Sequence, residues 1–212
     1  MINKKDPQDT KTKILDSAES LFSQKGFKGT SMREITSRAD VNLASVNYHF
    51  GSKEALLEEV IKRRILPINE IRERKLLDIE SSSAETGISP EPSDVIRAFL
   101  EPTIRFMDTG QGAREFISLI GRSISDPDDT VRNIFHKYII TIFELFFKLM
   151  QRSLPHLPSD VLFWRIHFVL GSMQHTMRIC GTNFEELERF NTDTETLIDY
   201  MMDFIMGGIS SK

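Results

Sequence analysis

The sequence predicts an all-α fold, with an N-terminal three-helix helix-turn-helix unit followed by a larger helical domain. Apolar residues recur at the three- and four-residue spacing of amphipathic helices along most of the 212 residues. Strand signals and tight hairpin turns are absent from the sequence. Hydrophobic residues make up 40% and charged residues 27% of the chain, which is typical of a globular protein with a buried core.

The first 50 residues carry three short helical patterns. A helix is predicted over residues 9–25, and Gly26 closes it as a C-cap. The serine and glutamate of Ser31–Glu34 form a capping box that opens a second helix. Asn42 caps a third helix over residues 43–50. The tight turn between the second and third helices has helix-turn-helix spacing.

The remaining chain is predicted to form longer helices. A fourth helix starts at Lys53 and is expected to end or kink at Pro67, because an interior proline removes a backbone hydrogen bond. Pro102 is expected to kink a later helix for the same reason. The segment 81–93, rich in serine and proline, is predicted to be a loop. Helices are predicted over residues 68–79, 94–109, 112–124, 127–153, 159–180 and 193–207.

Charge is distributed unevenly along the chain, whose net charge is −4. Residues 1–65 contain 12 Lys and Arg against 9 Asp and Glu, whereas residues 66–212 contain 15 against 22. A mildly basic N-terminal third joined to an acidic remainder can mark a nucleic-acid-binding end attached to a different working part. A local basic patch matters more than the net charge for such binding.

The compartment is expected to be cytoplasmic. The single cysteine, Cys180, excludes an internal disulfide framework and a multi-Cys zinc site. The N-terminus has no apolar signal core. The apolar runs at 138–150 and 161–173 are too short and too often interrupted by charge to cross a membrane, so no membrane partner is expected.

The third predicted helix has two different faces. At 100° per residue, Leu43, Val46 and Phe50 fall on one side and are expected to pack inward. The other positions are small or polar: Ala44, Ser45, Asn47, Tyr48 and His49. Small residues allow close approach to a DNA groove, and asparagine can pair with adenine through two hydrogen bonds. On spacing alone, DNA binding and a plain surface helix are equally good interpretations.

A longer pattern separates these interpretations. The stretch from Thr12 to Leu57 closely resembles the N-terminal domain of the TetR family of bacterial transcriptional regulators. The matching segments are ILDSA (14–18), LF (21–22), KGF (25–27), TSMREI (30–35) and YHFGSKEAL (48–56), with Ala39 and Val41 between them. The resemblance implies a helix-turn-helix DNA-binding domain over residues 1–55 and an effector-binding and dimerisation domain over residues 56–212.

The resemblance implies a role in DNA binding for nine residues: Thr30, Ser31, Arg33, Ala44, Ser45, Asn47, Tyr48, His49 and Lys53. Those before the third helix would meet phosphate or a base edge, the five on that helix would enter the major groove, and the lysine would hold a phosphate. For His49, a phosphate contact and a packing role remain equal alternatives. Many family members carry Tyr or a similar group where this chain has Asn47, so their operators do not transfer to it.

The C-terminal part of the chain is rich in phenylalanine and methionine. Residues 66–212 carry 12 of the 15 Phe, 7 of the 9 Met and the only Trp. A buried core explains most of them, but helices that are apolar on several faces also suit a ligand cavity or a subunit interface. Candidate ligand-binding residues are Phe99, Arg105, Arg122, Phe143, Phe147, Trp164, His167, Phe168 and Arg178. The cations among them would suit an anionic head group, although ion pairing or solvent exposure is their more common role.

A second, shorter resemblance bears on the effector. Arg63-Arg64 with Pro67, Asn69 and Arg72, and the later Gly121-Arg122, are similar to a TetR subgroup that senses fatty acyl compounds. The resemblance suggests a small lipophilic effector, such as a long-chain acyl-CoA or a fatty acid. Aromatic drugs and other lipophilic acids remain alternatives.

The leading hypothesis is a ligand-responsive dimeric repressor of a palindromic operator. A homodimer is expected through the helices at about 159–180 and 193–207, because Gly171 and Ser172 allow close approach and the last helix has a wide apolar stripe. An enzyme is not supported, since the sequence has no nucleophile elbow, phosphate loop or metal-ligand cluster. No catalytic residue, metal or cofactor is therefore expected. A DNA-binding protein of the same fold without an effector, acting through protein partners, is the alternative.

Overall fold

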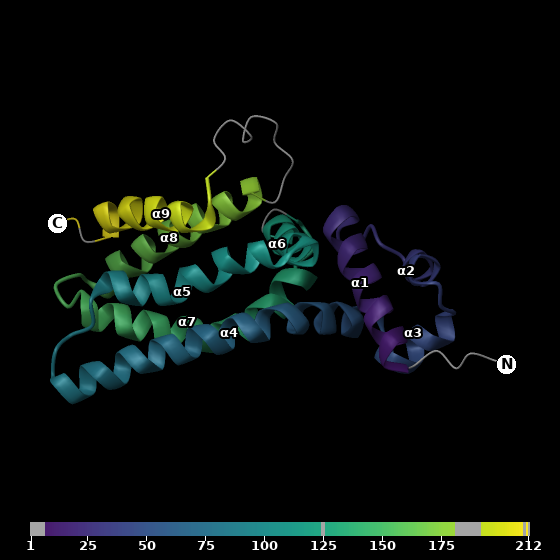
Figure 1. The fold of residues 1–212 in the computed structure, drawn as a ribbon, viewed down its shortest axis with the longest axis horizontal. Helices are drawn as coiled ribbons and strands as arrows, with labels where there is room; N and C mark the ends of the chain where they lie inside the picture. The colour runs from purple at the N-terminus through teal and green to yellow at the C-terminus, as the bar shows by residue number, and fades with distance from the viewer. Residues whose placement is uncertain (1–6, 124–125, 181–191, 210, 212) are drawn as a thin grey trace. The chain divides into compact units, whose positions relative to one another are not determined.

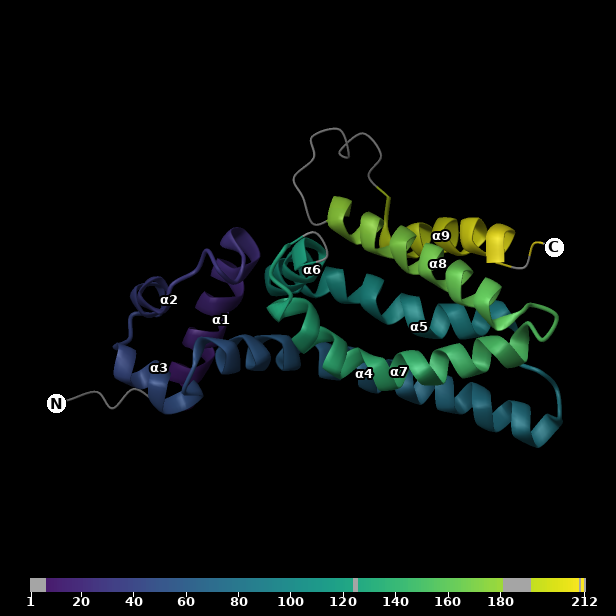
Figure 2. The same cartoon turned by 180° about the vertical axis from the view of Figure 1, so that it is seen from behind.

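The computed structural model describes residues 7–123, 126–180, 192–209 and 211, and all regular structure in these ranges is helical (Figures 1 and 2). The all-α prediction is therefore confirmed. The elements are α1 (Pro7–Lys25), α2 (Met32–Ala39), α3 (Leu43–Phe50), α4 (Lys53–Thr86), α5 (Pro92–Phe106), the 3₁₀ turn η1 (Met107–Thr109), α6 (Gln111–Ser123), α7 (Thr130–Ser153), α8 (Ser159–Cys180) and α9 (Thr194–Ile209).

The chain divides into two compact units. Unit 1 comprises residues 1–65 and 110–138, and unit 2 comprises residues 66–109 and 139–212. Helices α4 and α7 each run from one unit into the other. Helix α6 thus belongs to the same unit as the N-terminal helices. A single division at residue 55, as expected from the sequence, would assign α6 to the other domain.

Unit 1 is built around α1, which packs mainly against α6 and α2. The apolar face of α1 is fully buried through Ile14, Ala18 and Phe22, as its helical spacing predicts. Polar contacts add to this packing at the C-terminal end of α1. Arg122 of α6 donates to the backbone carbonyl of Gln24, one of the carbonyls that a helix end leaves without an intrahelical partner.

A buried carboxylate joins α1 to α4 within unit 1. Glu19 is 1% exposed, and its two oxygens accept hydrogen bonds from Arg63 and Arg64 over 2.5–2.8 Å. Gly112 of α6 leaves room for this arrangement, because a Cβ there would lie 2.1 Å from an Nη atom of Arg64. The three helices therefore meet at one charged cluster.

Unit 2 is a helical layer structure in which α5 and α8 both pack against α9 (Figures 1 and 2). Its core includes Phe99 of α5 and Phe146 of α7, whose rings stack with centroids 4.4 Å apart. Arg97 and Arg105 on α5 pair with Asp199 and Glu195 on α9. Among the described helices, none is long and apolar enough to cross a membrane.

Two expected boundaries differ from the structure. Helix α4 continues through the exposed Pro67 to Thr86, so the loop expected from residue 81 begins later. Ser83 stabilises this extension, because its hydroxyl donates to the Ile88 carbonyl and accepts from Arg152. Pro102 lies inside α5, as expected, and the helix continues on both sides of it.

The start of α7 is the second difference, since this helix begins at Thr130 instead of residue 127. The preceding aspartates hold a turn. The Asp128 N–H donates to Asp126, and the Asp128 carboxylate accepts from both the N–H and the hydroxyl of Thr130. Aspartate commonly competes with helix formation in this way.

Candidate nucleic-acid interface and effector region

Helices α2 and α3 are joined by a tight turn with defined caps. Ser31 and Glu34 form the predicted capping box at the start of α2. The turn is made by Asp40, which adopts left-handed backbone angles (φ 52°, ψ 51°) and donates its N–H to the carbonyls of Ser37 and Thr36. Asn42 then accepts from the Ser45 N–H at 2.8 Å and begins α3.

The inner and outer faces of α3 differ sharply. Val46 and Phe50 are buried, as predicted. Leu43 was expected to join them but is 45% exposed at the first position of the helix. On the outer face, Ala44 and Asn47 are exposed and the Tyr48 side chain is 85% exposed.

Two candidate residues of α3 make contacts within their own helix. The Ser45 hydroxyl donates to the Asn42 side chain at 3.0 Å and is only half-exposed. The His49 ring meets the Tyr48 ring edge-on at 5.2 Å and lies 6.0 Å from the buried Phe50 ring. His49 therefore bridges the exposed and buried faces, consistent with either role expected for it.

The expected phosphate contacts before α2 require a correction. Thr30 is 1% exposed, and its hydroxyl donates to the carbonyls of Leu21 and Gly26, so its side chain cannot reach a phosphate. Ser31 is exposed, but Glu34 accepts both its N–H and its hydroxyl proton at 2.8 Å. A phosphate at this helix start would have to displace the glutamate. Arg33 is exposed beside it.

Lys53, at the start of α4, lies against the helix-turn-helix unit. Its Nζ sits 4.3 Å from the centroid of the Phe27 ring, a cation–π contact, and the side chain is half-buried. Desolvation lowers the pKa of Lys53, opposed by the nearby carboxylates of Glu54, Asp128 and Glu34. The contact fixes the direction of the Lys53 side chain against the segment between α1 and α2.

Asp128 adds a negative charge to this region that the sequence did not reveal. One of its carboxylate oxygens lies 4.0 Å from the Nζ of Lys28, on the turn between α1 and α2. The same oxygen is buried without a hydrogen-bond partner. The α6–α7 connection thus brings an anion next to two lysines that flank the helix-turn-helix unit.

In unit 2, several candidate ligand residues belong to one continuous series of ring contacts, called here the aromatic row. It runs from Phe99 to Phe146, then to Phe143 at 6.3 Å, to His167 at 6.2 Å, and on to Phe163 at 4.0 Å. The row starts in the buried core and ends at exposed side chains of α8. Phe147 and Trp164 flank it, contacting Phe143 and Phe163 respectively.

The three candidate arginines do not join this row. Arg105 is exposed and pairs with Glu101 and Glu195, which together raise the pKa of its guanidinium. Arg122 belongs to unit 1, where it caps α1. Arg178 is exposed and contacts His175 at 3.4 Å. Each of the three therefore has a partner of its own, and their proposed contact with an anionic head group stays a prediction.

A different arginine occupies the inner end of the aromatic row. Arg72 of α4 is 3% exposed, and its guanidinium carbon lies 4.4 Å from the centroid of the Phe99 ring. It donates to the Phe99 carbonyl at 2.8 Å, to Asn69 at 3.2 Å and to the Thr103 hydroxyl. In the sequence, Arg72 stood out only as part of the resemblance to the acyl-sensing subgroup. Its burial results from tertiary packing, which the sequence does not reveal.

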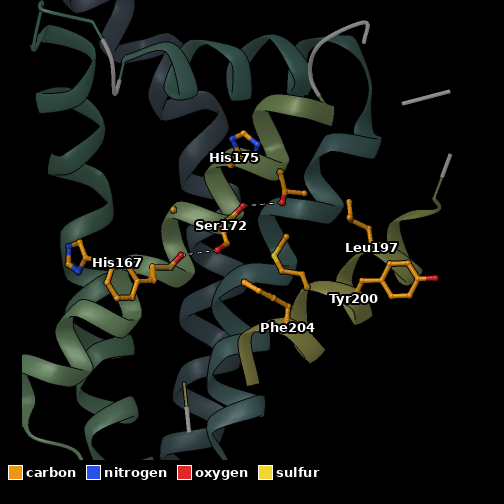
Figure 3. A pocket seen from close by; sticks show the side chains of 10 residues that line it. His167, Ser172, His175, Leu197, Tyr200 and Phe204 are labelled. Atoms are coloured by element: carbon orange, nitrogen blue, oxygen red, sulfur yellow. Dashed lines mark hydrogen bonds between the residues drawn. The ribbon is translucent and has the colours of Figure 1, made fainter. Parts of the chain in front are cut away.

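Helices α8 and α9 present an exposed apolar groove of about 720 Å³ (Figure 3). Tyr200 and Phe204 project from α9 on one side, opposite Ser172 and His175 of α8. Phe168 also lines the groove and, like the two α9 aromatics, is more than 60% exposed. Phe168 and His167 are therefore at this surface instead of inside a closed cavity. Within the described residues, no group of His, Cys, Asp and Glu is arranged to hold a metal ion.

The tight turn between α2 and α3, the exposed outer face of α3 and the separate helical unit define a helix-turn-helix DNA-binding protein with a second helical domain. The family model of the bacterial regulatory proteins of the tetR family matches residues 14–60. The model of the tetracyclin repressor-like C-terminal domain matches residues 97–208. The chain belongs to the TetR family of transcriptional regulators. Members are non-enzymatic, so family membership confirms that no enzyme activity is expected.

Related proteins agree with this membership. The chain is 27% identical over 164 residues to the provisionally assigned HTH-type transcriptional regulator YttP of Bacillus subtilis (strain 168), covering 76% of this chain and 72% of YttP. Over 52 residues, 24% of this chain and 28% of the relative, it is 42% identical to IcaR of Staphylococcus aureus (strain Newman), a negative transcriptional regulator of the biofilm operon icaADBC.

Solved structures share the fold. HlyIIR, a hemolysin II transcriptional regulator, superposes with a TM-score of 0.66 at 21% identity, covering 98% of this chain and all of that one. A Clostridium perfringens protein, provisionally described as a regulator of fatty acid metabolism, gives 0.65 at 22% identity, covering 94% of this chain and all of that one.

Proposed function

We infer that this transcriptional repressor works as a ligand-responsive homodimer in the cytoplasm, bound to a near-palindromic operator through two copies of α3. A lipophilic effector held in unit 2 would release the DNA. The main support for the DNA-binding part of this proposal is the outer face of α3. Tyr48 is 85% exposed on a helix whose other face buries Val46 and Phe50, and a large exposed aromatic at such a position suits a binding surface.

The base-reading residues proposed are Ala44, Asn47 and Tyr48, with Ser45 and His49 at their edge. Their exposure supports this, and the small Ala44 would let the helix approach closely. Arg33 and Lys53 are proposed to contact phosphate. For Ser31 the proposal is limited to an arrangement in which phosphate replaces Glu34, since the two anions would compete for the same donors.

The dimer is proposed to form through the groove of α8 and α9. Phe168, Tyr200 and Phe204 are exposed together there, and burying them against a second copy would remove their apolar surface from water. A twofold dimer also explains why a palindromic operator is expected, because each subunit would meet one half-site.

The effector is proposed to be a lipophilic molecule such as a fatty acid or an acyl-CoA. The support is the aromatic row of unit 2 and the structural likeness to the Clostridium perfringens protein described as a fatty acid metabolism regulator. Phe99, Phe143, Phe147, Trp164 and His167 remain in the proposed region. The alternative, a regulator that acts through protein partners without an effector, is favoured if no small molecule alters operator binding.

The proposal is tested by selecting duplexes from a random DNA pool with the full-length protein. A near-palindromic consensus is expected, with half-sites about one helical turn or a multiple of it apart. Lys53→Gln should weaken binding to selected and unselected duplexes alike and reduce the slope of affinity against salt concentration. Failure to enrich any sequence would overturn the operator-binding proposal.

A further inference from the structure

The charge of Arg72 is buried in unit 2, and none of the described residues places a carboxylate in contact with it. Its three recorded acceptors are the Phe99 carbonyl, the Asn69 amide oxygen and the Thr103 hydroxyl, all uncharged. The nearby Glu101 of α5 is instead paired with Arg105 at 2.6 Å and Lys75 at 3.9 Å. Burial lowers the pKa of the Arg72 guanidinium to about 9, which leaves it cationic at neutral pH.

A structural role alone does not account for a full charge at this position. Arg72 does tie α4 to α5 near Pro102, but its recorded bonds use only three of the five N–H groups of a guanidinium. An uncharged donor could make such bonds without the desolvation cost of a cation. Buried charges in proteins are normally balanced by a counterion. Among the described residues, no carboxylate contacts Arg72 to serve as its counterion.

The surroundings of Arg72 indicate what kind of molecule would supply the counterion. The guanidinium stacks on Phe99, the first member of the aromatic row, and the row leads through Phe146 and Phe143 to His167 at the surface of α8. A ligand that follows this row would meet apolar rings along its body and a cation at its inner end.

We propose that Arg72 is the anchor for the acidic group of the effector, so that the effector is a lipophilic organic anion lying along the aromatic row. This rests on the proposed ligand response. A carboxylate or phosphate would take the free N–H groups in charge-assisted hydrogen bonds, and a planar carboxylate suits the forked guanidinium best. Neutral lipophilic molecules would leave the buried charge unbalanced and bind less well.

The test compares each acid with its neutral counterpart. Binding of dodecanoate, dodecan-1-ol, 2-naphthoate and 2-naphthylmethanol to the full-length protein is measured by calorimetry, together with release of the selected operator. At least one acid should bind the wild type about tenfold to a hundredfold more tightly than its alcohol, as expected for a charge-assisted bond. Arg72→Met should abolish this preference, whereas the matched control Arg74→Met, an exposed arginine on the same helix, should retain it.

Each other outcome has a defined meaning. Equal binding of acid and alcohol, or an acid preference that survives in Arg72→Met, overturns the anchor. If the alcohols bind and release operator as well as the acids, ligand response stands and only the anchor fails. If none of the four binds, the anchor and the lipophilic-effector proposal both fail, while operator binding is judged separately. Should Arg72→Met not fold, Arg72→Lys keeps the charge but loses the fork, and it should weaken acids without affecting alcohols.

Discussion

The carboxylate of Asp128 lies 4.0 Å from the amine of Lys28, across the junction between the α6–α7 connection and the turn that precedes α2. It also contributes to the field around Lys53. Both lysines flank the proposed DNA surface. A DNA phosphate that approaches either lysine would therefore also be repelled by the Asp128 carboxylate beside it. We therefore expect the Asp128 carboxylate to weaken the attraction of the protein to DNA.

Replacing Asp128 by Asn should tighten DNA binding. The amide oxygen can still accept the two Thr130 bonds that stabilise the start of α7, so only the charge is lost. A gain of roughly threefold at low salt, fading as salt rises, is the scale for one partly screened charge. Fluorescence anisotropy on specific and random duplexes measures it. Asp129→Asn is the control, since that neighbour pairs with Arg132 instead, and an equal gain there would contradict the prediction.

Tyr48→Ala should weaken operator binding with little effect on folding. The side chain is 85% exposed, so its removal creates no cavity, and a base contact is worth about 1–3 kcal/mol of discrimination. The loss should be large on the selected operator and small on random DNA. Tyr48→Phe separates the ring from its hydroxyl and should retain the part due to stacking or methyl contact. Identical losses on both duplexes would show that Tyr48 does not read bases.

Phe204→Glu should produce a folded monomer that binds the operator weakly. Phe204 is 71% exposed in the single chain, so a charge is tolerated there unless the residue is buried in a dimer. Sedimentation at micromolar concentration should shift from dimer to monomer, and operator affinity should fall by about a hundredfold or more because two half-sites no longer act together. Ile88→Glu, at a similarly exposed apolar residue after α4, should leave both properties unchanged.

The capping box of α2 should make stability depend on acid pH. Hydrogen bonds from Lys25, and then from the backbone and side chain of Ser31, lower the pKa of Glu34 to about 2. The carboxylate therefore stabilises the folded state above its unfolded pKa of about 4.3, and this contribution is lost as pH falls towards 2. Urea unfolding between pH 5 and 2 should show a flatter profile in Glu34→Gln, which keeps a capping side chain. The same flattening in Glu70→Gln would refute the assignment.

The helix-turn-helix unit could be predicted well because its signals are local. The capping pair Ser31 and Glu34 and the cap Asn42 act on N–H groups within three residues of themselves, and both caps are formed in the structure. The spacing of Val46 and Phe50 likewise places them on one buried face. Such short-range features need no knowledge of the rest of the fold.

The sequence was less informative about residues whose partners lie outside their own helix. Arg105 forms an ion pair with Glu195, 90 positions away. The Thr30 hydroxyl donates to carbonyls of the preceding helix and turn. Arg72 of α4 donates hydrogen bonds to Phe99 and Thr103 on α5, and these contacts hold it in the interior. The sequence shows which residues carry a cation or a hydroxyl. Whether such a group contacts solvent, a carboxylate or neither depends on tertiary packing.

The close approach of Gly112 to Arg64 also constrains how this chain can vary. Gly112 lies within α6 and is not among the glycines with positive φ, so its backbone does not demand glycine. The present position of Arg64 favours glycine, because a Cβ at position 112 would overlap the end of this flexible side chain, and the guanidinium would have to shift from its place beside Glu19. Among relatives, residues 19, 64 and 112 should therefore change together: a larger residue at 112 should occur where the arginine at 64 is lost or redirected. A glycine that its own helix does not require can thus be favoured by a side chain from another helix.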